Sequence, residues 1–141
     1  MVNSVGVDLV QISEMKRLIE ISGDAFLFRT FTEEEIRLSQ EASSRDEYFS
    51  SRFAAKEATF KAVAPFLKRK TFDLRIVETL DKPDGSPTIK MNDNIKLLLE
   101  EAGITALHVS LSHDGDYAIA FVLAEKINNN NLQAGLCDTI L

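Results

Sequence analysis

Residues 52–63 read Arg52-Phe53-Ala54-Ala55-Lys56-Glu57-Ala58-Thr59-Phe60-Lys61-Ala62-Val63, and the rest of the chain is organised around them. Strong helix formers dominate the stretch, which contains neither Gly nor Pro, so it predicts a helix from about Glu47 to Phe66. At about 100° per residue, the four alanines gather on one face, where another element can approach closely. Glu57 and Lys61 fall between this face and an apolar ridge, while Arg52 and Lys56 share a separate stripe.

The position of Glu57 raises a question of charge. A carboxylate beside apolar surface is costly unless a cation or a hydrogen-bond network compensates it. Lys61 lies one turn further along in the favourable Glu-then-Lys order, and a bound divalent metal is a second compensator. An ordinary surface ion pair is the third interpretation. The helix alone leaves the three open.

Length and composition favour one soluble domain. The chain has 141 residues, of which 45% are hydrophobic and 27% charged, as in globular proteins. No run approaches the roughly 20 apolar residues of a membrane span, and we expect no secretory signal. The only cysteine, Cys137, excludes an internal disulfide and fits a reducing cytoplasm. The net charge of −6 argues against general nucleic-acid binding.

Two apolar stretches predict buried strands. Residues 5–10 are rich in β-branched side chains, and residues 117–123 form a nearly continuous apolar run, which predicts a central strand. Asp8 interrupts the first stretch, so it either caps the strand end or points into a site. We expect further strands at residues 72–80, 88–91 and 108–113, with turns at residues 82–85 and 114–116.

Capping signals predict three shorter helices. Ser13 is expected to cap a helix that reaches Ile21 and is broken at residues 22–24. Thr32 and Glu35 form a capping box for a helix to about Glu41. A third helix is expected from residues 92–93 to Gly103. The organisation expected is one domain over residues 1–126 and a mobile tail over 127–141.

Three segments together resemble the holo-acyl-carrier-protein synthases, a family of small phosphopantetheinyl transferases. Their order and spacing are similar to the family's over roughly residues 4–126, which implies its α+β fold, a small antiparallel sheet packed with a long central helix and shorter helices. The segments are Gly6-Val7-Asp8-Leu9-Val10 with Phe31-Thr32-Glu33-Glu34-Glu35, residues 52–58 with Lys61-Ala62, and His108-Val109-Ser110-Leu111-Ser112-His113 with Tyr117-Ala118-Ile119-Ala120.

The resemblance implies a Mg²⁺-dependent enzyme that transfers 4′-phosphopantetheine from coenzyme A to a serine of apo acyl carrier protein, releasing 3′,5′-ADP. The metal would bridge the pyrophosphate and the carboxylates of Asp8 and Glu57, and hard oxygen ligands suit Mg²⁺. Phosphoryl transfer asks the protein mainly for positioning and charge neutralisation. Lys61 is implied as catalytic, either neutralising charge or accepting the serine proton, and a metal-bound water is an equally good base.

The resemblance also assigns the remaining site residues. Arg52, Lys56 and His113 match basic positions near the coenzyme's phosphates, Ser112 adds a hydroxyl, and Arg45 is a candidate for the 3′-phosphate or a neighbouring subunit's ligand. From the residues alone, His113 reads as a turn histidine. Family members of this size form trimers with active sites between subunits, so we expect a homotrimer.

Several positions depart from the family's pattern. Acidic carrier proteins should dock on basic side chains of the first helix, yet Glu14 stands at an arginine position. Residues 63–67 replace a Gly-Thr-Gly loop, and Ser86 replaces a lysine in a turn. These departures suit an alternative, a non-catalytic subunit that binds coenzyme A or the carrier. Retention of Asp8, Glu57 and Lys61 argues against this alternative. A third interpretation is a Mg²⁺-dependent phosphohydrolase that acts on nucleotides, but without a Gly-rich loop its phosphate-binding nest is hard to place.

Overall fold

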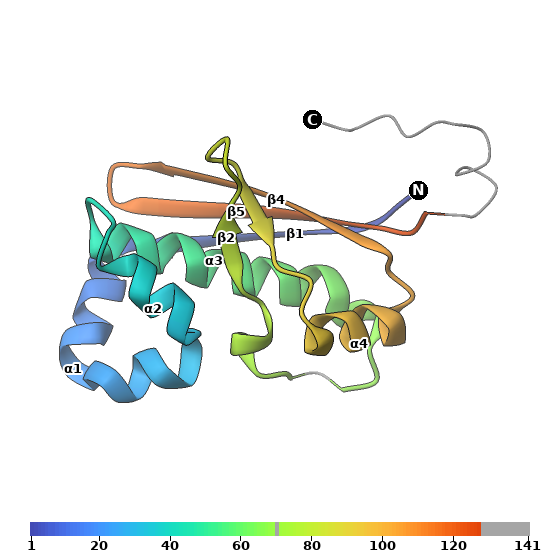
Figure 1. Ribbon diagram of the computed structural model, residues 1–141, viewed down its shortest axis with the longest axis horizontal. Coiled ribbons are helices and arrows are strands. Elements are labelled where there is room, and N and C mark those ends of the chain that lie inside the picture. The colour runs from blue at the N-terminus through green and yellow to red at the C-terminus, as the bar shows by residue number, and fades with distance from the viewer. Residues whose placement is uncertain (70, 128–141) are drawn as a thin grey trace.

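The computed structural model describes residues 1–69 and 71–127, and it has the predicted α+β architecture (Figure 1). A three-stranded sheet lies above a long helix, and the shorter helices lie on the far side of that helix. The elements in chain order are β1 (Val2–Gln11), α1 (Ile12–Thr30), α2 (Glu33–Ser39), α3 (Arg45–Val63), the 3-10 helices η1 (Ala64–Phe66) and η2 (Leu74–Ile76), β2 (Thr79–Asp81), β3 (Pro87–Ile89), α4 (Asp93–Ala102), β4 (Ala106–Asp114) and β5 (Tyr117–Glu125).

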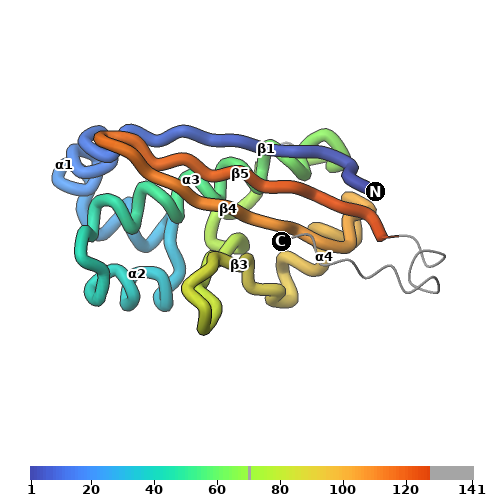
Figure 2. The backbone as a smooth tube through the Cα atoms, turned by 90° about the horizontal axis from the view of Figure 1, so that it is seen from above, coloured from blue at the N-terminus to red at the C-terminus, as the bar shows by residue number. Residues whose placement is uncertain are grey.

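The sheet is antiparallel, with strand order β1-β5-β4 (Figure 2). The last strand therefore lies in the middle, as predicted for residues 117–123. Asp8 pairs with Ala120 and His113 with Ala118, so these four residues share the face toward α3. A separate hairpin pairs β2 with β3.

The alanine face of α3 packs against the sheet, as its spacing predicts. Ala54, Ala55, Ala58 and Ala62 are all fully buried. Opposite them, a Cβ added to Gly6 would lie 2.0 Å from the carbonyl oxygen of Ala58. Because no side chain fits there, Gly6 lets β1 approach the α3 backbone closely.

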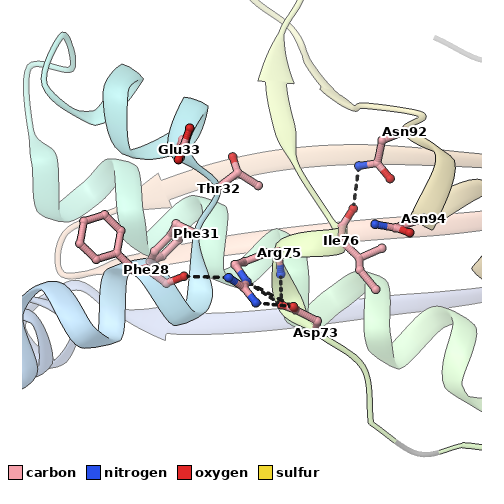
Figure 3. Close-up of a pocket in the computed structure, with 9 residues that line it drawn as sticks. All are labelled: Phe28, Phe31, Thr32, Glu33, Asp73, Arg75, Ile76, Asn92 and Asn94. Carbon is pink, nitrogen blue, oxygen red and sulfur yellow. Dashed lines mark hydrogen bonds and ion pairs between the residues drawn. The ribbon is translucent and has the colours of Figure 1, made fainter.

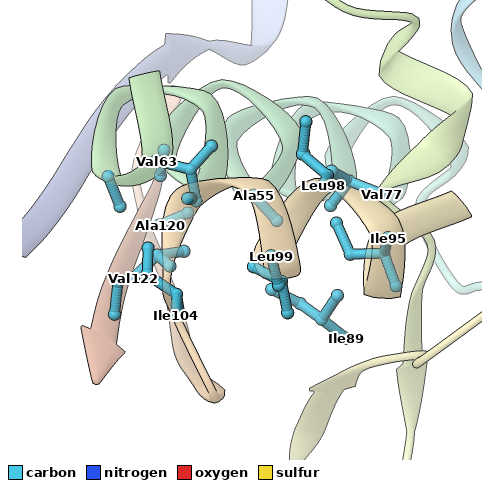
Figure 4. Close-up of a cluster of buried hydrophobic side chains, with 14 of the residues drawn as sticks. Ala55, Val63, Val77, Ile89, Ile95, Leu98, Leu99, Ile104, Ala120 and Val122 are labelled. Atoms are coloured by element: carbon cyan, nitrogen blue, oxygen red, sulfur yellow. The ribbon is translucent and has the colours of Figure 1, made fainter. Parts of the chain in front are cut away.

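The α4 helix packs into the same core as α3 and β5 (Figure 4). Ile95, Leu98 and Leu99 of α4 are buried in this core. Asn92 caps the helix through its side chain, and Gly103 ends it at φ 72°, so both predicted ends are confirmed. A second core packs aromatic residues of α1 and α3 with the α1–α2 junction, and its members are Met15, Ile19, Phe26, Leu27, Phe31 and Phe49.

The prediction that the first strand is buried is wrong. Val5, Val7 and Leu9 are between 50% and 60% exposed. β1 is an edge strand, and α3 covers only one face of the sheet, so alternate side chains point away from the core. The same holds for β5, where Ile119 and Phe121 lie on the uncovered face although the strand is central.

The start of α1 also differs from the prediction. Gln11 occupies the N-cap position, whereas the backbone N–H and hydroxyl of Ser13 both donate to the carboxylate of Asp116. The expected break is confirmed at Gly23, whose φ of 54° is non-helical. The chain then returns to a helix and continues to Thr30.

Residues 72–80 do not form the predicted strand. They contain the short helix η2, and only Thr79–Asp81 is extended as β2. The capping box at Thr32 is confirmed, with reciprocal bonds between Thr32 and Glu35. The α3 helix ends at Val63 and tightens into η1, where Pro65 cannot donate a backbone bond.

The predicted tail falls mostly on residues 128–141, which lie outside the described residues. Within the parts of the chain that the structure describes, no helix combines the length and hydrophobicity needed to cross a membrane.

Candidate functional site

Asp8 and Lys61 meet where β1 crosses the second half of α3. Lys61 Nζ lies 3.0 Å from Asp8 Oδ1 and 3.0 Å from the carbonyl oxygen of Val7. The side chain of Asp8 is only 16% exposed, whereas that of Lys61 is 53% exposed. The contact depends on Gly6, because the close approach of strand and helix brings the two side chains into reach.

Glu57 completes a group of three charged residues. It lies one turn before Lys61 on α3 and is partly buried. Burial is the main cause that raises the pKa of Glu57, the negative charge of Asp8 raises it further, and Lys61 lowers it. The two carboxylates are therefore electrostatic neighbours, and one lysine does not fully compensate them.

This donor set fits a magnesium ion. Burial and the charge of Asp8 raise the pKa of Glu57 against the opposing effect of Lys61, and a divalent cation would further compensate its ionised form. In residues 1–69 and 71–127, no group of three or more His, Cys, Asp or Glu side chains could hold a metal by itself. Mg²⁺ is commonly held by one or two carboxylates together with waters and substrate phosphates. Two carboxylates, with waters and substrate phosphates as the remaining ligands, match that pattern.

Lys56, which the resemblance places near the coenzyme's phosphates, points into the protein in this structure. Its side chain is fully buried, and Nζ lies 2.7 Å from Glu35 Oε1 and 3.1 Å from the carbonyl oxygen of Leu74. A third bond goes to the carbonyl oxygen of Val77. An ammonium has three donors, so all are used inside the protein. Burial lowers the pKa of Lys56, and Glu35 opposes this most strongly.

Arg52 is likewise turned inward, and this placement disagrees with the expected phosphate contact. Only 7% of the residue is exposed. Its guanidinium donates to Asp81 at 3.1 Å and to the hydroxyl of Ser51 at 3.2 Å. It also stacks over the ring of Tyr48, with 4.4 Å from Cζ to the ring centroid. Arg52 thus ties α3 to the end of β2.

The other expected coenzyme contacts lie away from Asp8 and Glu57 within one chain. Arg45 begins α3, twelve residues before Glu57, which corresponds to about 18 Å along the helix axis. His113 Nδ1 lies 3.2 Å from Glu47 Oε1, also near the start of α3. Ser112 pairs with Ile119 on the uncovered face of the sheet. One chain therefore brings together Asp8, Glu57 and Lys61 but not the remaining candidates.

Glu35 is a buried acid whose interaction the sequence did not reveal. The capping motif identified it as a helix cap, yet its side chain is fully buried and also pairs with Lys56. A local motif carries no signal for a partner 21 residues away. The sequence did show that Arg52 and Lys56 lie on a different stripe of the helix from Glu57. It gave no other indication of where these two side chains point.

Two hollows of about 490 Å³ each lie outside the group of three. Figure 3 shows the first, where Arg75 donates to Asp73 between the end of α1 and the start of α4. None of the residues expected in the site lines it. The second runs between the β2–β3 hairpin and the uncovered face of β4 and β5, and it includes Ser86, His108 and Phe121.

Comparisons with known proteins identify the family. The sequence profile of the 4′-phosphopantetheinyl transferase superfamily matches residues 4–122. A holo-[acyl-carrier-protein] synthase of Halothermothrix orenii is 31% identical over 126 residues, which cover 89% of this chain and 99% of the relative. The chain belongs to the 4′-phosphopantetheinyl transferase superfamily, which confirms the resemblance seen in the sequence.

Solved structures agree with this assignment. The crystal structure of the holo-[acyl-carrier-protein] synthase from Neisseria meningitidis is 32% identical, with a TM-score of 0.80, and the match covers 89% of this chain and all of that one. An ACPS–CoA complex from Chronobacterium ammoniagenes is 31% identical, with a TM-score of 0.75 and coverage of 89% and 98%. The expected α+β transferase fold is therefore confirmed.

Proposed function

We propose that this chain is a holo-acyl-carrier-protein synthase with an active site built on Asp8, Glu57 and Lys61. It transfers the 4′-phosphopantetheine group from coenzyme A to a serine of apo acyl carrier protein and releases 3′,5′-ADP. Its membership of the transferase superfamily and its similarity to synthases over most of their length support this activity. The observation that carries the site is the meeting of these three charged residues where β1 crosses α3.

In this proposal, Asp8 and Glu57 hold Mg²⁺, which when bound neutralises charge on the pyrophosphate of coenzyme A. Asp8 is fixed in direction because its strand pairs with β5 and its carboxylate accepts from Lys61. Lys61 adds a positive charge beside the position of the phosphates. Its ammonium donates to two oxygens, an arrangement that suits electrostatic stabilisation of the transferred group.

We further propose that the site is completed by a second copy of the chain within a homotrimer. Arg45 lies about 18 Å along α3 from Glu57, Ser112 lies on the opposite face of the sheet from Asp8, and His113 pairs with Glu47, so in this proposal they serve a neighbour's site. The uncovered sheet face supports this assembly, because Val7, Leu9 and Phe121 leave an apolar surface exposed there.

The carrier protein is the second substrate, and we propose that the reaction takes place in the cytoplasm. The single cysteine suits such a reducing compartment. The first helix carries Lys16 and Arg17 as candidates to contact an acidic carrier, although Glu14 opposes it.

The test is incubation of the protein with coenzyme A, Mg²⁺ and apo acyl carrier protein, followed by mass measurement of the carrier. We expect a gain of one phosphopantetheine group. We expect Asp8→Ala and Glu57→Ala to lower the rate by at least about 10³-fold, since each removes charge stabilisation from a phosphoryl transfer. Both variants should remain folded, as judged by circular dichroism at room temperature.

The control is Glu41→Ala, which removes an exposed carboxylate in the turn after α2 and should leave the rate unchanged. Tight binding of coenzyme A without transfer would favour the non-catalytic subunit instead. Unfolding of Asp8→Ala or Glu57→Ala would show that these acids are structural.

A further inference from the structure

We infer that Lys56, together with Glu35, is a positioning residue that sets the orientation of Glu57 toward Asp8. The inference rests on the proposed assignment of Asp8 and Glu57 as the metal-binding pair. It concerns a buried ion pair that touches neither the coenzyme nor the metal, and it acts on the site through α3.

The contacts of Lys56 join three separate parts of the chain. Its Nζ lies 2.7 Å from Glu35 Oε1, in the first turn of α2, and bonds to the carbonyl oxygens of Leu74 and Val77 at either end of η2. Glu35 in turn accepts from the backbone N–H of Thr32 at 3.0 Å and from that of Thr79 at 3.4 Å. The pair thus fixes α2, η2 and the start of β2 to one point on α3.

Lys56 and Glu57 are consecutive residues that face different sides of α3. Side chains one position apart differ by about 100° around a helix, so any rotation of α3 that moves Lys56 moves Glu57 equally. Lys56 faces η2 and α2, whereas Glu57 faces the edge of the sheet near Asp8. Holding Lys56 therefore holds the direction in which Glu57 points.

The directional contacts between α3 and β1 lie in the last turn of the helix, beyond Glu57. There the hydroxyl of Ser4 donates to the carbonyl oxygen of Ala62, and Lys61 donates to Asp8 and to the carbonyl oxygen of Val7. Before that turn, β1 meets α3 through alanine side chains and the backbone of Gly6, and such dispersion contacts are non-directional. Lys56 adds three hydrogen bonds on another side of α3, and hydrogen bonds have strict angular preferences.

The chemistry of the pair agrees with a geometric role. Burying two charges carries a desolvation cost, and a well-packed apolar pair is often as stable or more stable. Both side chains are 0% exposed, so neither charge is offset by solvent. An ion pair that costs stability is explained if it fixes the orientation of α3 beside a site that needs accurate geometry.

The test compares wild-type protein with Lys56→Met and with the double variant Glu35→Gln/Lys56→Met. Methionine keeps much of the side-chain volume and removes all three bonds. Glutamine preserves the capping box and removes the charge that Lys56→Met alone would leave buried. Leu98→Ala, a truncation in the α4 core, serves as the control for a general loss of stability.

Four quantities are measured: the thermal midpoint, kcat with saturating substrates, equilibrium binding of coenzyme A without metal by calorimetry, and Mn²⁺ binding in the presence of coenzyme A by electron paramagnetic resonance. For the double variant we expect a kcat about 10²-fold lower, because small misplacements at a reacting centre carry such losses. We expect Mn²⁺ affinity to fall at least about tenfold, as when residues behind metal ligands are changed. The affinity for coenzyme A without metal should be unchanged.

Two results would overturn the positioning role. The first is a double variant whose kcat and Mn²⁺ affinity match those of Leu98→Ala, because the pair would then serve stability alone. The second is a tenfold loss of metal-free coenzyme A affinity, because Lys56 would then contact the phosphates. A fully active Glu57→Ala enzyme is a separate failure, since it would remove the metal assignment itself.

Discussion

Glu57 has an energetic cost that follows from its proposed role. Partial burial and the neighbouring charge of Asp8 both raise its pKa, and Lys61 only partly offsets them. In the folded protein without metal, the ionised form of Glu57 is therefore less favourable than in the unfolded chain. Without a bound divalent cation, the charge of this carboxylate therefore destabilises the folded protein.

This cost predicts how stability depends on pH. Because the folded-state pKa of Glu57 lies above its ordinary value of 4.5, the folded protein holds the proton more tightly than the unfolded chain. Glu57 therefore disfavours folding least at pH values below its ordinary pKa. It disfavours folding more as pH rises through the folded-state pKa, because the carboxylate then ionises in the folded protein. We expect Glu57→Gln to raise the thermal midpoint at pH 7 in metal-free buffer while abolishing transfer.

The measurement is the thermal midpoint of wild type and Glu57→Gln between pH 4 and pH 8 in the presence of a chelator. The difference between the two should shrink toward the acid end, where wild-type Glu57 becomes protonated. Glu20→Gln, on the exposed side of α1, is the matched control. A Glu57→Gln variant that is less stable than wild type at pH 7 would contradict the expected sign.

Lys61 gives a second prediction at the scale of single residues. Its ammonium donates to Asp8 and to the backbone of β1, so we assign it a charge-stabilising role. Arginine keeps the charge but cannot act as a base. We expect Lys61→Arg to stay within about tenfold of wild-type kcat, and Lys61→Met to lose at least about 10²-fold. Steady-state rates over a pH series test this, and equal losses in both variants would instead favour a base.

The sequence allowed Glu57 and Lys61 to be predicted because their relation is local. Helical spacing alone relates the two residues, and a family motif relates them to Asp8. The burial of Lys56 could not be predicted because its acceptors lie on α2 and around η2, up to 21 residues away. Nothing in the order of residues 52–63 indicates that a lysine in this stripe ends at a carboxylate and two carbonyl groups rather than at a phosphate.

At the scale of elements, the crossing of β1 and α3 determines whether the site can exist. A Cβ on Gly6 would meet the backbone of Ala58, which no trimming of side chains can move aside. We expect Gly6→Ala to destabilise the protein by more than about 3 kcal/mol, because the strand must shift or the core must open. The displaced strand would carry Asp8 away from Glu57.

Chemical denaturation measures this loss, and the transfer assay measures the effect on the site. Asn3→Ala is a control in the same strand, where the side chain is exposed, and we expect a change below about 0.5 kcal/mol. A Gly6→Ala protein with near-normal stability would mean that β1 and α3 tolerate a wider spacing.

The elements themselves were predictable to different degrees. Residues 92–103 contain both capping signals of α4, and the capping box of α2 is equally local, so these helices were correct. The face that each strand buries depends on which strands pair and on which element covers the sheet. Neither of these can be predicted from a few consecutive residues. Val5, Val7 and Leu9 were therefore expected inside, although they point away from α3.

At the scale of the whole molecule, those same side chains form an apolar surface on the uncovered side of the sheet. The surface consists of exposed residues from β1 and β5, namely Val5, Val7, Leu9, Tyr117, Ile119 and Phe121. Exposed apolar patches of this kind commonly mark contacts between proteins. Arg45, Ser112 and His113 have other partners or lie on another face within one chain, so covering this surface with another copy would supply both burial and basic groups for the site.

This reasoning predicts that Phe121→Glu disrupts both assembly and transfer. A carboxylate in the middle of the apolar surface must be desolvated when copies meet, which carries a large cost. Sedimentation should give three times the 15.7 kDa chain mass for wild type and one chain mass for the variant. Ile21→Glu, on the exposed side of α1, should remain assembled. If Phe121→Glu is monomeric, folded and fully active, one chain holds the complete site and Arg45, Ser112 and His113 have no part in a neighbour's reaction.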